Sequence, residues 1–364
     1  MQRGNYTILI VCEGEKTEPL FFNSIRDELI DNKYNNDIRK IKITIAPEPS
    51  IDILYKNNTV VKHKSKRKKR KTIKVEEIDK IKIIDGRPPL RWVLTAQREL
   101  LEGAFNEVWV VFDNDDHPGK KEAFEIAKKN KVNIAYSSRS FEYYLLIHFK
   151  KIYRPFNKTD CKTKIFNTNK EVYVRCGTNI FPETDCNGSV CINGYAQINN
   201  YWENTNQRNT KNSETTYSLI KDKLEIGFEN AAWIRYKSDV LENEVPIYDR
   251  NPYLSTDDIV KKLIGDNNIY IWVSLNEKRF FKEVGLEVKI VSDYIEIKNI
   301  SNSTILFQEK SITVITEKER FTIGNRSIIY VDESVLFNIS KYSLKKYWFK
   351  IAYKKYRIMF ENET

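Results

Sequence analysis

The sequence predicts an α/β protein, in which a parallel β-sheet flanked by helices is followed by a region made of β-strands alone. Three observations predict this class. Short, continuously apolar runs at 8–12 and 108–112 are typical of strands buried on both faces of a parallel sheet. Segments with helical periodicity lie between such runs. From about residue 268 the chain changes to short alternating segments separated by turn residues, a pattern typical of a β-sandwich.

Strand and helix patterns alternate from the N-terminus onward. An apolar strand is predicted over 7–12, and Gly14 separates it from a helix that Thr17 can cap. Residues 39–46 alternate in polarity and predict a strand with one wetter face, and 89–101 form an amphipathic helix. This alternation predicts parallel strands joined by right-handed crossovers.

The same pattern continues and then breaks. We predict a strand at 107–112, a charged helix at 119–130, a short strand at 132–136 and a mostly apolar helix from Phe141 to Phe149. Residues 155–217 are rich in Asn, Thr and Lys with poor periodicity, and we interpret them as an inserted subdomain.

Helical periodicity resumes at 217–232 and again between Thr256, as the expected cap, and Gly265, as the expected stop. Seven short strands are predicted beyond this point, at 270–273, 286–290, 294–297, 312–315, 321–323, 327–331 and 348–353. We therefore predict an α/β domain over 1–266 and a β-rich, sandwich-like domain over 267–364.

Bulk composition limits the class of protein. The chain has 364 residues, of which 41% are hydrophobic and 30% charged, as in a soluble globular protein. No apolar stretch approaches the roughly 18 residues that span a bilayer. The segment before the first strand has no signal-peptide core, and five cysteines suit a reducing compartment. We therefore expect a cytoplasmic protein.

The net charge of +11 is concentrated in one predicted loop at 56–75. Eight of its cations lie between residues 62 and 71 without any acid, namely Lys62, Lys64, Lys66, Arg67, Lys68, Lys69, Arg70 and Lys71. Such a run either keeps a loop solvated or contacts a phosphate backbone. It contains no aromatic residue, so it favours backbone contact over base stacking.

Acidic residues follow two of the predicted strands. Glu13 comes directly after the first, and Asp113 and Asp115 end the later one. Ligands bind beyond the carboxyl ends of strands in open α/β sheets, so these acids are expected to share one crevice. Carboxylate oxygens suit Mg²⁺, and two such ions can support phosphodiester hydrolysis. Glu18, Asp116 and Glu142 are further candidates; Glu18 is expected near the same strand end.

A purely structural role for these acids stays open, because Asp, Asn and Glu are also common as turn and helix-cap residues. His117 is either a proton donor beside the acids or a turn residue, and His148 is expected to cap a helix or lie at the core edge. Cys161, Cys176, Cys186 and Cys191 allow a structural Zn²⁺ site, although their spacing is wide for one.

Longer motifs carry a family resemblance. Cys12-Glu13-Gly14-Glu15-Lys16-Thr17-Glu18 and Val111-Phe112-Asp113-Asn114-Asp115-Asp116-His117 resemble the RloB-like branch of the Toprim superfamily, as do Phe141-Glu142-x-x-Leu145-Leu146-x-His148-Phe149 and Asn251-Pro252. The resemblance covers roughly 6–150 and 220–265, and omits the basic loop, the insertion and the β-rich region.

The resemblance implies a Toprim-like sheet and a Mg²⁺-dependent (or Mn²⁺-dependent) nuclease. The candidate metal ligands are Glu13, Glu18, Asp113, Asp115 and Asp116, and the catalytic candidates are Glu13, Glu18, Asp113, Asp115 and Glu142. Glu13 either holds a metal or handles a proton. It also implies an anti-phage effector that acts with an ABC-type ATPase on DNA or RNA, tRNA included. Two other functions stay open. The chain can be a non-catalytic nucleic-acid-binding adaptor, or a primase-like nucleotidyltransferase that shares the same acids.

Overall fold

The computed structural model describes two compact units, each considered by itself: residues 1–227 with 243–265, and residues 228–242 with 266–364. The described residues are 6–31, 41–47, 81–114, 117–160, 162–164, 171–173, 190–202, 213–274, 280–281, 285–291, 294–307, 312–316, 320–323, 327–338, 347–353 and 355–361. The predicted basic loop, Asp115, Asp116 and three of the four insertion cysteines (Cys161, Cys176 and Cys186) lie outside them.

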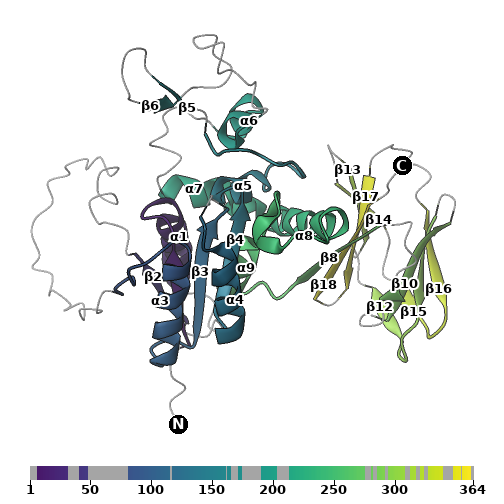
Figure 1. The fold of residues 1–364 in the computed structure, drawn as a ribbon. Helices are drawn as coiled ribbons and strands as arrows, with labels where there is room; N and C mark the ends of the chain where they lie inside the picture. Colours follow the sequence, from purple (N-terminus) through teal and green to yellow (C-terminus); the bar gives the residue numbers. More distant parts are fainter. Residues whose placement is uncertain are drawn as a thin grey trace, which may run out of the picture. The chain divides into compact units, whose positions relative to one another are not determined.

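A five-stranded sheet in the order β2-β1-β3-β4-β7 forms the centre of the first unit (Figure 1). Its strands are β1 (Tyr6–Cys12), β2 (Ile41–Ala46), β3 (Glu107–Asp113), β4 (Asn133–Ser138) and β7 (Tyr253–Leu254). The first four pair in parallel, and β7 runs antiparallel to β4. The carboxyl ends of β1, β3 and β4 therefore lie at one edge of the sheet.

The sheet packs against helices α1 (Thr17–Asp31), α3 (Leu90–Leu101), α4 (Lys120–Asn130), α5 (Phe141–Leu146) and α9 (Thr256–Ile264). The described residues also form α6 (Ile192–Ile198), α7 (Ser213–Ile220) and α8 (Leu224–Leu241), with 3₁₀ turns η2 (Lys221–Lys223) and η3 (Ile247–Asp249). The inserted region also contains the short strands β5 (Lys162–Lys164) and β6 (Glu171–Tyr173).

One face of the sheet packs against α3 and α4. Leu9 pairs with Val108 and Val11 with Val110, so these four side chains lie on the same face. They share a buried apolar cluster with Trp92 of α3 and with alanines of α4. Burial on both faces explains why β1 and β3 are continuously apolar rather than alternating.

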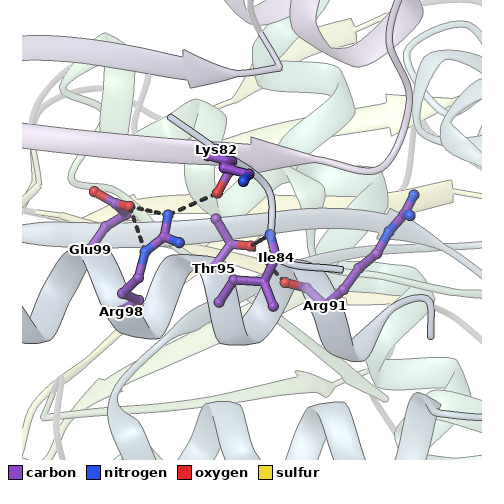
Figure 2. A network of polar contacts seen from close by, with 6 residues as sticks. All are labelled: Lys82, Ile84, Arg91, Thr95, Arg98 and Glu99. Atoms are coloured by element: carbon purple, nitrogen blue, oxygen red, sulfur yellow. Dashed lines mark hydrogen bonds and ion pairs between the residues drawn. The ribbon is translucent and has the colours of Figure 1, made fainter. Parts of the chain in front are cut away.

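The segment before α3 is held along that helix by polar contacts, which Figure 2 shows. The backbone N–H of Ile84 donates to Thr95 Oγ1 (2.9 Å), and this hydroxyl donates to the Arg91 carbonyl (2.7 Å). One turn further on, Arg98 donates to the Lys82 carbonyl (2.8 Å). The Arg91 side chain points away from this network (Figure 2).

The helix predicted from Phe141 to Phe149 ends earlier, at Leu146. The Tyr144 carbonyl interacts with the His148 ring Nδ1 (2.8 Å), while the His148 backbone N–H turns to the Leu145 carbonyl (3.2 Å). This shift to tighter hydrogen bonds is the usual way in which a helix satisfies its last carbonyls.

Two other helix boundaries also differ from the prediction. The helical pattern predicted at 217–232 extends from Ser213 to Leu241, interrupted by η2. Thr256 is the first residue of α9 rather than its cap, which is Ser255; Gly265 ends the helix with φ +76° as predicted.

The second unit contains mostly antiparallel sheets with part of α8. Its strands are β8 (Ile269–Ser274), β9 (Phe280–Phe281), β10 (Leu286–Val291), β11 (Tyr294–Asn299), β12 (Ile305–Phe307), β13 (Ile312–Thr316), β14 (Arg320–Ile323), β15 (Ser327–Ile329), β16 (Ser334–Asn338), β17 (Tyr347–Tyr353) and β18 (Tyr356–Glu361). They form sheets in the orders β16-β11-β10-β9, β12-β15 and β14-β13-β17-β18-β8. Only the β18–β8 pair of the described strands in this unit is parallel.

The fold class predicted from the sequence is thus confirmed in its main features: a sheet with parallel strands, flanking helices, and separate antiparallel sheets toward the C-terminus. Within the described residues, no helix combines the length and apolar character needed to cross a membrane.

Candidate functional site

Glu13 and Asp113 meet at the carboxyl edge of the sheet. The Glu13 backbone N–H donates to the Val111 carbonyl (2.9 Å), which extends the β1–β3 pairing by one residue. This places Glu13 Oε2 to accept the backbone N–H of Asp113 (2.9 Å). The other oxygen, Oε1, lies 2.9 Å from His117 Nε2. Glu13 therefore links the ends of β1 and β3 to His117, which lies in the segment before α4.

Glu18 joins the same cluster from the first turn of α1. Glu18 is only 6% exposed, and a Cβ on Gly14 would collide with the Glu18 carboxylate. The missing side chain of Gly14 therefore leaves room for the Glu18 carboxylate in this position. Burial raises the pKa of the Cys12 thiol, and the nearby charge of Glu18 raises it further.

Asp113 is a strongly perturbed carboxyl group of the cluster. Burial raises its pKa well above the ordinary value. The negative charges of Glu18, Glu13 and Glu142, in decreasing order, raise it further. A hydrogen bond from the Phe141 backbone N–H opposes this shift. Asp113 Oδ1 is buried and has no hydrogen-bond partner within the described residues.

Glu142 lies in the first turn of α5, after β4. It is partly buried, and Ser140 Oγ donates to its Oε2 (2.7 Å). The predicted acids Glu13, Glu18, Asp113 and Glu142 are thus brought within electrostatic reach of one another. They come from β1, α1, β3 and α5, which converge because the strands are parallel neighbours.

Asn114 was not singled out from the sequence, yet it is the centre of a polar network beside the acids. It is 5% exposed, and its amide donates to Ser138 Oγ (2.8 Å). Lys120 Nζ donates to its Oδ1 (2.5 Å), and Arg139 donates to its carbonyl (2.8 Å). The only sequence signal was its position between Asp113 and Asp115. This network fixes the turn that carries Asp113.

The two histidines take different places. His117 is partly exposed, contacts Glu13, and has the Trp92 ring against it with centroids 6.2 Å apart. His148 is buried at 1% exposure, and burial lowers its pKa to about 4. His117 therefore lies in hydrogen-bond contact with Glu13, whereas His148 is a neutral interior residue at pH 7.

The donor set suits a hard divalent cation, although no three acidic, His or Cys side chains within the described residues are arranged as a metal site. Oxygen ligands dominate, and a buried carboxylate oxygen of Asp113 has no partner among the described groups. Mutual repulsion of these carboxylates is what a cation relieves. The residues therefore fit Mg²⁺ or Mn²⁺. Of the four cysteines considered for zinc, Cys191 is described, and it is buried and free of disulfides.

The fold and the site together define an α/β protein that gathers carboxylates at the carboxyl edge of a largely parallel sheet. The RloB-like protein family matches residues 8–263, and the chain belongs to this family. No curated protein and no solved structure matches the chain.

Proposed function

We propose that the first unit is a Toprim-like, Mg²⁺-dependent nuclease domain that hydrolyses phosphodiester bonds of DNA or RNA. The observation that carries this proposal is Asp113, whose Oδ1 is buried without a hydrogen-bond partner within the described residues and whose pKa is raised by burial and by three neighbouring carboxylates. Acidic groups packed against one another repel and are costly for folding, and strongly perturbed groups cluster at functional sites.

Glu13, Glu18 and Asp113 are the proposed metal ligands, with Asp115 and Asp116 as further ligands outside the described residues. A bound divalent ion would supply charge neutralisation and an activated water. The proton transfer and the positioning of the acids are assigned to side chains of the protein itself. Glu13, 2.9 Å from His117, either holds the metal or handles a proton with His117, and Glu142 is the second proton-handling candidate. Lys120 and Arg139 keep the Asp113 turn in place through Asn114.

The direct test incubates the purified chain with end-labelled single-stranded RNA, tRNA and duplex DNA, in Mg²⁺ or Mn²⁺ and in EDTA. Cleavage that requires metal and falls at least 100-fold in Asp113→Asn is expected, because one charged group near the reacting phosphate contributes about this much. Glu122→Gln, on an exposed position of α4, is the matched control.

Binding without cleavage under every condition would instead favour the adaptor function, and incorporation of labelled nucleotides would favour the primase-like function. A metal-induced rise in Tm that is lost in Asp113→Asn would support the metal site independently of turnover.

We further propose that the chain is the effector of an anti-phage system and is controlled by an ATPase partner, and that the cations between Lys62 and Lys71 contact the phosphate backbone. Replacing six of these cations with Ser should flatten the salt dependence of nucleic-acid binding. Co-expression with a neighbouring ATPase should yield a complex. A fully active and toxic chain without any partner would overturn the control mechanism.

A further inference from the structure

A cluster of rings and cations lies around the C-terminal side of α5 and around α6, in the first unit. We call it the aromatic–basic cluster; it consists of Phe149, Arg154, Tyr195, Tyr201 and Lys223. The Phe149 and Tyr201 rings stack with centroids 5.6 Å apart and an angle of 25°. Lys223 Nζ lies 4.0 Å from the Phe149 ring, and the Arg154 guanidinium lies 5.7 Å from the Tyr195 ring.

Two of these rings contact buried aromatic side chains. Phe156 and Trp202 are 1% and 6% exposed, and they contact Tyr195 and Phe149 respectively. By contrast, Phe149, Tyr195 and Tyr201 are only partly buried. The outer rings therefore form a supported platform that keeps part of its surface open to solvent.

The chain next to the platform is basic. Residues 150–158 contain four cations and no acid; the cations are Lys150, Lys151, Arg154 and Lys158. The aromatic residues Tyr153 and Phe156 lie between them in the sequence. The backbone here is held in place, because Tyr143 Oη donates to the Ile152 carbonyl (2.7 Å) and Asn251 Nδ2 to the Phe156 carbonyl (3.1 Å). Cations and rings are thus presented on a fixed segment.

The platform is connected to the acidic site by one short helix. The N-terminal residue of α5, Phe141, donates its backbone N–H to Asp113, and Glu142 follows in the same turn. Phe149 comes three residues after the end of α5, which is about 9 Å long at 1.5 Å per residue. Phe149 therefore follows, by a few residues, the helix whose first turn contacts the acidic site.

We propose that the aromatic–basic cluster stacks unpaired bases of a single-stranded nucleic acid while Arg154 and its neighbouring lysines contact the phosphates. This inference rests on the proposed function, because it specifies the substrate as single-stranded at this position. Aromatic rings flanked by cations are the common means of holding unpaired bases, since every base has a π-face. Bases of a duplex are already stacked on one another and do not offer these faces.

Binding is measured by fluorescence anisotropy with labelled single-stranded RNA, single-stranded DNA of the same sequence, and the matching duplex. All measurements are made in EDTA, so that the result does not depend on cleavage. Tyr201→Leu should weaken single-strand binding about 5- to 150-fold, as expected for loss of one stacked base, and leave duplex binding unchanged. Tyr201→Phe keeps the ring and should bind as the wild type does.

Tyr330→Leu is the matched control, since Tyr330 is 57% exposed in the second unit. Arg154→Gln should reduce the salt dependence of single-strand binding, whereas Lys128→Gln on α4 should not. The RNA and DNA arms decide which single strand is preferred.

Equal losses in Tyr201→Leu and Tyr201→Phe, or equal losses for single strand and duplex, would overturn the stacking inference. An unchanged affinity in Tyr201→Leu would do the same. Ring-dependent single-strand binding by a chain that never cleaves would support the inference and refute only the nuclease.

Discussion

Glu13 and Asp113 are hydrogen-bonded to each other, carboxylate to backbone N–H at 2.9 Å, although they lie 100 positions apart in the chain. The contact follows from strand pairing, since Cys12 is opposite Val111 in the β1–β3 register. The next residues of both strands therefore emerge together at the carboxyl edge. The hydrogen bond from the Asp113 backbone to the Glu13 carboxylate holds two acidic residues close together. The repulsion between their charges predicts how the stability of the chain depends on pH.

Asp113→Asn is expected to stabilise the chain at neutral pH in the absence of metal. The raised pKa of Asp113 means that its folded form binds a proton more readily than its unfolded form. The carboxylate consequently lowers stability once the pH exceeds the ordinary value of about 3.9. Removing the charge should contribute about 1–2 kcal/mol, or a rise in Tm of ~2–8 °C.

Thermal unfolding in EDTA between pH 4 and pH 8 measures this effect. The difference between Asp113→Asn and the wild type should shrink as the pH falls toward 4, because the carboxyl of the unfolded chain begins to bind its proton near its ordinary pKa of about 3.9. A difference that stays constant across the range would show that charge repulsion is not its cause.

His148 is expected to give the opposite pH dependence. Its folded pKa of about 4 lies below the ordinary value of 6.5, so the unfolded chain takes up the proton first as the pH falls. Stability should decrease between pH 6.5 and pH 4 by at most ~3 kcal/mol from this group. His148→Asn keeps a donor for the Tyr144 carbonyl but does not titrate.

Urea unfolding of both proteins at a series of pH values isolates this contribution. The wild type should lose stability relative to His148→Asn as the pH falls through this window. Parallel curves for the two proteins would contradict the prediction and would indicate that His148 becomes protonated without unfolding.

Gly227→Ala should destabilise the first unit, although alanine ordinarily favours a helix interior over glycine by about 1 kcal/mol. A Cβ at this position of α8 would collide with the His148 ring. Overpacking of this kind costs about 1–3 kcal/mol. The measurement is the urea midpoint of Gly227→Ala in two backgrounds, wild type and His148→Ala.

His148→Ala removes the ring that the new methyl group meets. In that background Gly227→Ala should be neutral or stabilising, and the coupling between the two changes should exceed about 0.5 kcal/mol. Additive effects would mean that His148 and Gly227 do not pack closely.

The residues that could be predicted from the sequence are those whose role depends on strand order alone. Glu13 and Asp113 follow apolar strands, and parallel pairing was enough to expect their meeting. The role of Asn114 depends on side chains from β4, α4 and the segment around Arg139, which no local pattern contains. Likewise, Gly14 is explained only by the position of the Glu18 carboxylate.

Strand partners were harder to predict than strands. The alternating segments of β8, β10, β11, β13 and β17 were recognised, whereas β16 and β18 were not. In β16, Leu336 is 56% exposed while Phe337 is buried, so its apolar residues do not mark one face. The parallel pairing of β18 with β8 joins segments far apart in the chain, and periodicity carries no information about partners.

The second unit contains a buried ion pair whose removal should be costly. Lys350 Nζ in β17 lies 2.6 Å from Glu229 Oε1 in α8, and their side chains are 11% and 3% exposed. The same turn of α8 accepts the Trp272 indole N–H at the Glu229 carbonyl (2.7 Å). Lys350→Met removes the ammonium group that pairs with the buried Glu229 carboxylate. Such a change typically lowers the free energy of unfolding by about 3–5 kcal/mol, which urea unfolding measures.

The matched control is Lys289→Met, which breaks the surface pair with Glu296 at 2.9 Å; Lys289 is 47% exposed, so little change is expected. A double variant, Lys350→Met with Glu229→Leu, removes both buried charges and should recover most of the lost stability, because the desolvation of two ions is no longer required. If Lys350→Met were no more destabilising than Lys289→Met, the pair would contribute nothing to holding α8 against β17. If the double variant were as unstable as the single one, the lost stability would come from packing of the Lys350 stem rather than from its charge.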